Sequence, residues 1–264
     1  MQRTFLRRLA GATAGLLVTG SSAFAADLGV PPPVLAPLPV FTWTGFELGV
    51  QVGGGAGRTS VNVDGNFTPA LLPAFPSSAS YGSSGVFGGI HLGFNYQLTG
   101  PLVVGIQAEY NFAGITGTAV APPLNFLSTS IREFGSADAR VGVAFDRLLI
   151  YAIGGFAYAD IRNQIQLLGL APGVINYFSV NRYGFDVGGG LEYNFYGNWT
   201  ARAEYRYYDW GTRGFNSPGF GSLVNGIVTF AIPNHSSRET LHTGRIGLTY
   251  KFGWPYTTGV VARY

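Results

Sequence analysis

The chain has 264 residues, with 40 glycines, 15% aromatic residues and no cysteine. Only 11% of the residues are charged, whereas ordinary soluble domains carry about a quarter. The lack of cysteine excludes disulfides and thiol chemistry, and with them zinc–thiolate and iron–sulfur sites. Lys251 is the only lysine, so the chain has no basic patch for a nucleic acid. This composition is typical of a protein whose surface contacts a less polar medium as well as water.

The first 25 residues have the pattern of a secretory signal peptide. Three arginines in the first eight residues precede a short apolar stretch, and residues 23–25 fit an A-x-A cleavage site. The apolar stretch is too short to span a membrane as a helix. Cleavage is therefore predicted between Ala25 and Ala26. Those three arginines equal the whole net charge of +3, so the mature chain is close to neutral.

A proline-rich stretch and one long domain follow. Residues 26–42 contain "VPPPVLAPLPV" and show no alternation, which predicts an extended periplasmic tether. Residues 43–264 are expected to form a single all-β domain, because apolar and polar residues alternate through most of it. The alternating segments are 46–53, 86–98, 102–112, 132–145, 148–160, 182–195, 199–211 and 243–252. All but the first are about 10–14 residues long, against a mean of 5–6 in soluble sheets.

The connections between these segments alternate in length. Short ones at 99–101, 146–147 and 196–198 are rich in Gly, Asn and Asp, as tight turns are. Long ones are expected at about 58–82, 113–130, 161–178 and 209–237. This alternation is typical of an eight-stranded antiparallel up-and-down transmembrane β-barrel with short periplasmic turns. The stretch 222–232 could add two strands, so a ten-stranded barrel stays open.

The charged residues decide which face of each strand looks inward. In "WTARAEYRYYDWG" (199–211), Arg202, Glu204 and Arg206 share one face and the apolar residues share the other. A soluble sandwich would place the charges in water. A membrane barrel places them in the lumen, and the strand length, the scarcity of Lys and the aromatic strand ends favour the barrel. The segment 148–160 alternates poorly, and its facing is not predicted.

The inward face is then expected to hold a network of paired charges. Eight strands leave a lumen that side chains fill, and an unpaired buried charge is costly. Glycines on the same face would make room for long arginines. The expected network is Glu47, Glu109, Asp138, Arg140, Asp186, Glu192, Arg202, Glu204, Arg206, Arg245 and Lys251, with Arg132 and Arg182 on the same face.

Several of these stretches resemble a known family. "FTWTGFELGVQVGGGAG" after the tether, "AEYRYYDWG" and "LTYKFG" are similar to the porin-family outer-membrane β-barrel proteins of Gram-negative bacteria, of the opacity-protein and OmpA-barrel-like surface-antigen type. The resemblance implies a structural or surface-interaction role in the envelope and no enzymatic chemistry. The family's barrel typically ends at a final aromatic, here Phe252, yet the chain continues to Tyr264. Either residue could be the assembly-signal aromatic.

The residues also limit catalysis and partners. Three histidines, His91, His235 and His242, have no metal-ligand spacing, and neither a cofactor nor a nucleotide is indicated. A Ser–His–acid site near His235 would make the chain a lipid-modifying enzyme, but neighbouring strand residues point to opposite faces. A small-solute porin is the alternative to a filled barrel. The expected partners are outer-membrane lipid, lipopolysaccharide and the barrel-assembly machinery; the oligomeric state is not predicted.

Overall fold

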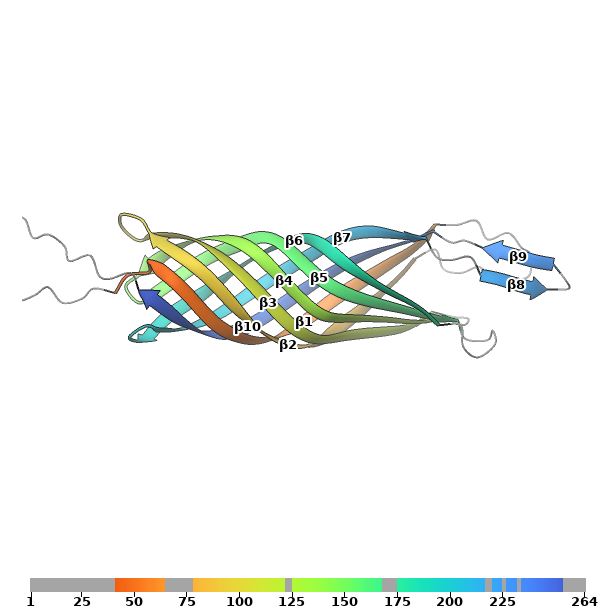
Figure 1. The fold of residues 1–264 in the computed structure, drawn as a ribbon, viewed down its shortest axis with the longest axis horizontal. Coiled ribbons are helices and arrows are strands. Elements are labelled where there is room, and N and C mark those ends of the chain that lie inside the picture. The colour runs from red at the N-terminus through yellow and green to blue at the C-terminus, as the bar shows by residue number, and fades with distance from the viewer. Residues whose placement is uncertain are drawn as a thin grey trace, which may run out of the picture. The chain divides into compact units, whose positions relative to one another are not determined.

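Eight long strands close a single antiparallel barrel (Figure 1). The computed structural model describes residues 41–64, 78–121, 125–167, 175–216, 220–224, 227–231 and 234–253. Around the barrel the order is β1-β10-β7-β6-β5-β4-β3-β2. The barrel strands are β1 (Gly45–Asp64), β2 (Ser78–Gln97), β3 (Leu102–Ala121), β4 (Asn125–Phe145), β5 (Leu148–Leu167), β6 (Ile175–Tyr196), β7 (Trp199–Asn216) and β10 (Asn234–Gly253).

The barrel is an up-and-down meander that closes between its first and last strands. β1 pairs with β10 from Gly45↔Gly253 to Asp64↔Asn234. Within 222–232 the chain does form strand, because β8 (Phe220–Val224) pairs with β9 (Ile227–Ala231). These two strands make a separate sheet, so the barrel has eight strands and not ten. Among the described residues, no helix is long and apolar enough to cross a membrane.

The strands are longer than the alternation indicated. Barrel strands run to 18–22 residues, and the long connection expected at 113–130 is wrong, because β3 reaches Ala121 and β4 begins at Asn125. The extra residues are rich in Ser, Thr and Asn, as in "NFLSTS" at the start of β4. Polar residues on both faces give no period-two signal, although the backbone ladder continues through them.

The short turns lie where they were expected. β2 and β3 are joined by 98–101, β4 and β5 by 146–147, and β6 and β7 by 197–198. Asp146 and Gly197 take positive φ values of 52° and 50°, which Asp and Gly tolerate in tight turns. Short turns mark the periplasmic end of an outer-membrane barrel. Gly45 and Gly253 lie at the same end.

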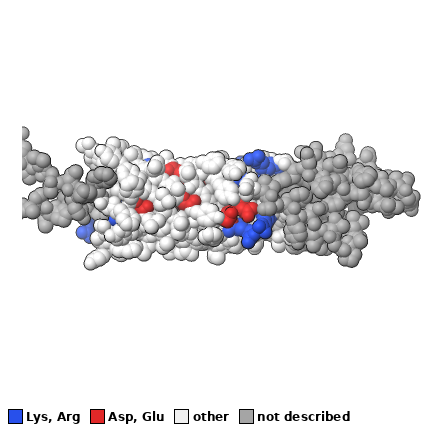
Figure 2. All heavy atoms as spheres, viewed as in Figure 1, with Lys and Arg blue, Asp and Glu red and all other residues white. Residues whose placement is uncertain are grey.

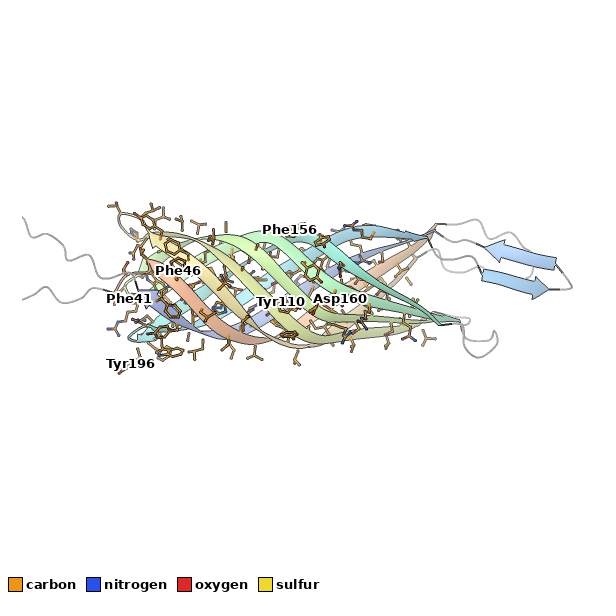
Figure 3. The ribbon with its side chains drawn as sticks, in the orientation of Figure 1. Phe41, Phe46, Tyr110, Phe156, Asp160 and Tyr196 are labelled. Carbon is orange, nitrogen blue, oxygen red and sulfur yellow. The ribbon has the colours of Figure 1, made fainter. Side chains whose placement is uncertain are left out.

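An apolar band covers the outside of the barrel above these turns. Val50, for example, is 57% exposed although it lies mid-strand. Figure 3 labels Phe46 and Tyr196 near the turn end and Phe156 and Tyr110 farther along the strands. In Figure 2 the visible face of the band is mostly uncharged. Its residues include Phe46, Leu48, Val50, Val52, Ile90, Leu92, Ile106, Val141, Phe156, Val187, Leu191, Tyr205, Ile246, Leu248 and Phe252.

For two strands, β5 and β4, only the structure shows which residues point into the lumen. In β5, Tyr151 and Ile153 point inward while Ile150 and Phe156 point outward. Both faces of β5 are apolar, which is why its sequence could not distinguish them. In β4 the register shifts between Ile131 and Glu133, and this bulge leaves Arg132 exposed. The expectation that Arg132 faces the lumen is therefore wrong, because a bulge exchanges the two faces.

Candidate functional site

The centre of the lumen is organised around Arg206 of β7. Its Nε donates to Glu204 Oε1 at 2.5 Å, and its Nη1 donates to Asp138 Oδ2 at 2.5 Å and to Asp186 Oδ2 at 2.9 Å. Its Nη2 lies 3.4 Å from Glu109 Oε2. One guanidinium thus meets carboxylates from β3, β4, β6 and its own strand. Arg206 and Glu204 both come from the stretch "RAEYR", whose charged residues the alternation placed on one face.

A second arginine, Arg245 of β10, extends the network towards β3. Its Nη1 donates to both carboxylate oxygens of Glu109, at 2.7 and 2.6 Å. Its Nη2 donates to the Tyr208 hydroxyl at 2.6 Å, and that hydroxyl donates to Glu109 Oε1 at 2.8 Å. Arg202 bonds two amide side chains instead, Gln107 Oε1 at 2.8 Å and Gln51 Oε1. Uncharged polar side chains therefore also accept hydrogen bonds from the buried arginines.

The remaining predicted residues meet nearer the periplasmic end. Arg140 Nη2 lies 2.8 Å from Glu47 Oε2, and its Nη1 lies 3.3 Å from Glu192 Oε2. Lys251 Nζ lies 3.3 Å from Glu47 Oε2 and 3.9 Å from Glu192 Oε1. All eleven residues of the expected network are buried. In it six carboxylates face five cations, so the charges are close to balanced.

Inward glycines make space for these arginines. A Cβ at Gly188 would come 2.8 Å from Arg206 Cγ, and one at Gly105 would come 3.3 Å from Arg140 Cγ. Both distances are shorter than ordinary van der Waals contact. The same Cβ atoms would come still closer to a neighbouring backbone carbonyl oxygen, 2.2 Å from that of Tyr205 at Gly188 and 2.8 Å from that of Phe94 at Gly105. The strand backbone and the arginine together therefore require glycine at these two positions.

An apolar layer closes the lumen on the periplasmic side of the charges. Trp43, just before β1, is 1% exposed and packs with Val103, Leu149, Tyr151 and their neighbours. Its Nε1 donates to the Asp146 carbonyl at 3.2 Å, and its ring lies 4.8 Å from Lys251 Nζ. The indole thus covers the last cation of the network.

A second apolar layer lies on the other side of the charges. Phe134 is fully buried there, with Phe87 5.1 Å and Tyr208 5.4 Å from its ring centroid. The Arg245 guanidinium lies 5.1 Å from the Phe87 ring. The layer consists of Phe87, Ile115, Ile131, Phe134, Ala157, Ala159, Ile161, Tyr208, Trp210 and Leu241. The sequence analysis missed both layers, although Phe87 and Tyr208 lie on the charged face.

Beyond the second layer is a small polar cluster in the extracellular half of the barrel. Thr59 Oγ1 donates to Glu239 Oε2 at 2.5 Å, and Arg182 Nη1 donates to the Ser237 carbonyl at 3.0 Å. Arg182 thus faces inward, as expected. Burial raises the pKa of Glu239 to about 7, against the lowering effects of the Thr59 hydrogen bond and the Arg182 charge. Along the barrel axis Glu239 lies about 30 Å or more above Phe252, because the strand between them is tilted. It is therefore beyond the apolar band, which is about 25 Å tall in such barrels.

The histidines do not form a catalytic or metal site in the described part of the chain. His91 is buried, with Nε2 2.9 Å from Thr249 Oγ1, as expected for a structural histidine. His242 faces outward, with Nδ1 2.6 Å from the Tyr205 hydroxyl. The side chain of His235 lies outside the described residues. No cluster of three or more His, Asp or Glu able to hold a metal is present among those described.

The other predicted residues lie at the ends of the chain. Phe252 is 52% exposed near the end of β10, in contact with Tyr250. Tyr264, Ala25 and Ala26 lie outside the described residues, as do the signal peptide, most of the tether and the extension after Gly253. The cleavage site and the choice of assembly-signal aromatic stay predictions.

The chain is similar in sequence to known outer-membrane proteins. The chain is 30% identical over 239 residues to the 31 kDa outer-membrane immunogenic protein of Brucella melitensis, covering 88% of this chain and 94% of the relative. It is 26% identical over 179 residues to the 22 kDa outer membrane protein of Rhizobium leguminosarum, covering 67% and 69%. The solved OprG of Pseudomonas aeruginosa covers 80% of this chain and 97% of its own, at 11% identity and a TM-score of 0.46.

The family model for the outer membrane protein beta-barrel domain matches residues 13–253, which includes every strand of the barrel. The chain therefore belongs to this family of outer-membrane β-barrel proteins.

Proposed function

We propose that this outer-membrane barrel is closed to solutes and has no enzymatic activity. Its role is then to anchor, in the membrane, the ends of its own strands that extend beyond the apolar band on the side opposite the short turns. The filling of the lumen supports the proposal most directly. Two apolar layers, around Trp43 and around Phe134, bracket the buried charge network. Water and ions would have to displace packed side chains to cross, and protein interiors resist such rearrangement.

The arrangement of the inward polar groups supports a structural role over catalysis. The carboxylates at the centre and the periplasmic end of the lumen are engaged by arginine or lysine, as Glu109 is by Arg245 and Glu47 is by Arg140, and Glu239 accepts from Thr59. Ser237, a buried serine in the extracellular half of the barrel, accepts from Arg182 Nη2. Groups held this way stabilise the barrel, and their hydrogen bonds and ion pairs favour a structural role among the described residues.

Assembly by the barrel-assembly machinery is part of the same proposal. Phe252 is exposed, follows the alternation of β10 and ends the apolar band on the last strand. We assign it the role of the assembly-signal aromatic. Phe252→Ala should then lower the amount of folded barrel in the outer membrane, while Tyr264→Ala should not.

Conductance of the refolded protein in planar bilayers tests the closed lumen. We expect no steady current from the wild-type protein. A steady, ion-selective conductance would show that the lumen is open to water, and a small-solute porin would then replace the closed anchor.

A further inference from the structure

The part of the barrel farthest from the short turns is split between β6 and β7. Among the described residues, the β6–β7 pairing ends at Phe185↔Asp209. Beyond this pair, β6 stays paired with β5 as far as Ile175, and β7 stays paired with β10 as far as Asn216. Figure 1 shows the end of β7 apart from the ends of β5 and β6. Each of the two strands therefore has one open edge.

A bulge in β7 lies where the split begins. Gly211 has a φ of 68°, in the left-handed region, and its N–H donates to Asp209 Oδ1 at 2.9 Å. The register between β7 and β10 shifts at the same level, between Arg238 and Thr240. A bulge bends the strand that carries it, which accounts for the divergence of β7 from β6.

The split lies beyond the apolar band. Asp209 follows Trp199 by about ten residues, which at about 3.3 Å per residue and a tilt of about 40° places it about 25 Å above the turn end. The apolar band of such barrels is also about 25 Å tall. Open strand edges do not occur in contact with lipid, because their backbone groups would have no partner there. β6 and β7 are therefore paired through the membrane and separate only above it.

The opposite seam of the barrel, between β2 and β3, is held together. Its described pairing also stops short of the strand ends. A Cβ at Gly117 of β3 would come 2.5 Å from the Gly82 carbonyl oxygen of β2, so the two backbones stay in contact. The Tyr81 hydroxyl of β2 lies 2.6 Å from Thr129 Oγ1 of β4, which bridges this seam. The split between β6 and β7 is therefore the better candidate for an added strand.

The open edge of β6 lacks the residues that usually protect an edge strand. Edge strands normally carry lysine, another charge or proline, which prevents a second chain from pairing with them. Residues 175–181 read "INYFSVN", with no charged residue and no proline. More than half of them are β-branched or aromatic, as strand-forming segments are. The backbone N–H and C=O groups of this edge can therefore accept a further extended strand.

The inner face beside the split carries two arginines. Directly paired residues share a face, and Arg213 of β7 is paired with the buried Ser237 of β10. Arg213 therefore lies on the inner face, yet its side chain is exposed, since β6 has separated from β7 at this level. Arg182 of β6 crosses the base of the split, where its Nη1 donates to the Ser237 carbonyl at 3.0 Å.

The charges on this face favour an acidic partner. Burial lowers the pKa of Arg182, Glu239 raises it and the like charge of Arg213 lowers it. The two arginines are thus close enough to repel each other. Two guanidinium groups against one carboxylate give this face an excess of positive charge. A carboxylate on an added strand would make a charge-assisted hydrogen bond with the exposed Arg213.

We propose that the split binds an extended, acidic segment of another protein, which pairs with the open edge of β6 as a further strand and places a carboxylate against Arg213. The proposal rests on the anchoring role proposed above and not on the closed lumen. Conductance tests the lumen and peptide binding tests the split, so the two can fail separately.

Binding of a synthetic peptide to the full mature chain, refolded in detergent micelles, tests this. The acidic probe is a peptide of about ten residues that alternates valine with glutamate, and its basic counterpart alternates valine with lysine. The wild type should bind the acidic peptide and not the basic one. Arg213→Glu should bind the acidic peptide at least about tenfold more weakly and should bind the basic one instead, because the charge contact is reversed.

Arg147→Glu is the matched control. It reverses the same charge on an exposed side chain in a periplasmic turn and should bind both peptides like wild type. If Arg213→Glu does not fold, as judged by gel mobility without heating, Arg213→Gln replaces it, and this variant should lose the acidic peptide without gaining the basic one.

The backbone of the probe supplies the second arm. Successive N–H groups of a strand point to opposite edges, so the acidic peptide is N-methylated either at its valines or at its glutamates. At least one of the two forms should lose binding, because the edge that faces β6 then has no donors. No binding of the acidic peptide to the wild type, wild-type affinity in Arg213→Glu, an equal loss with Arg147→Glu, or full binding of both N-methylated forms would each overturn the proposal.

Discussion

Arg206 and Asp138 form a close ion pair at the centre of the barrel, with 2.5 Å between Nη1 and Oδ2, and the same nitrogen also donates to Asp186. Removal of this guanidinium should destabilise the barrel more than any other single change in the lumen. Arg206→Ala leaves buried carboxylates without their partner, at a cost of about 3–5 kcal/mol. Urea unfolding in lipid vesicles measures the loss.

Asp186→Asn is the control for that variant. Six carboxylates face five cations in the network, so one negative charge is in excess. An amide at position 186 removes the excess and can still accept from Arg206. We expect a far smaller change than in Arg206→Ala. Equal losses for the two variants would mean that packing, and not charge, holds the centre together.

The space at Gly188 can be tested by adding one methyl group. Gly188→Ala places a Cβ 2.2 Å from the Tyr205 carbonyl oxygen and 2.8 Å from Arg206 Cγ, so the β7 backbone and its arginine must both shift. Gly244→Ala adds the same methyl group on the outer surface, where nothing lies within 4 Å. Overpacking costs typically about 1–3 kcal/mol, so only Gly188→Ala should lower the urea midpoint.

The depth of the apolar band can be measured with two exposed valines. Val50 is 57% exposed within the band, and Val120 is 66% exposed far beyond it along β3. Val50→Arg should cost about 2–4 kcal/mol, as an arginine on the lipid face near the membrane midplane does, and Val120→Arg about zero. Folded yield in lipid vesicles compares them. If both fold equally well, the band is not in contact with lipid.

Glu239 lies above the apolar band, and its titration should make the free energy of unfolding of the barrel depend on pH. Its carboxyl group titrates near 4.5 when exposed and at a pKa of about 7 when folded. Between these values the folded state binds the proton more strongly, so stability falls as the pH rises from about 4.5 to 7 and is constant above that.

Glu239→Gln should remove this fall and raise stability above pH 7 by up to about 3 kcal/mol. Urea unfolding from pH 4 to pH 8 follows it. A wild-type profile that rises with pH over this range would contradict the assignment to Glu239.

The signal peptide is tested by mass. The mature protein should begin at Ala26, because residues 23–25 fit the cleavage motif. Intact mass of the protein extracted from outer membranes gives the answer directly. Retention of Met1 would contradict the predicted cleavage.

For most strands the sequence predicts which residues face the lumen, because the charged residues all fall on one face of the strand. In β7, Arg202, Glu204 and Arg206 recur every second residue, and only one face of a strand can hold all three. That pattern, with the strand length, predicted the barrel, its lumen charges and its eight strands. It failed where the pattern is absent, as in the apolar β5, or where a bulge exchanges the faces, as at Arg132.

What only the tertiary structure decided is which charge meets which. Arg140 and Glu47 are far apart in the chain and on strands that are not paired, yet they lie 2.8 Å apart across the lumen. The alternation fixes only the face of each residue. Its height and neighbours depend on the register of every strand pair and on the stagger with which the barrel closes. These are properties of the whole ring of eight strands, and no single segment of the sequence contains them.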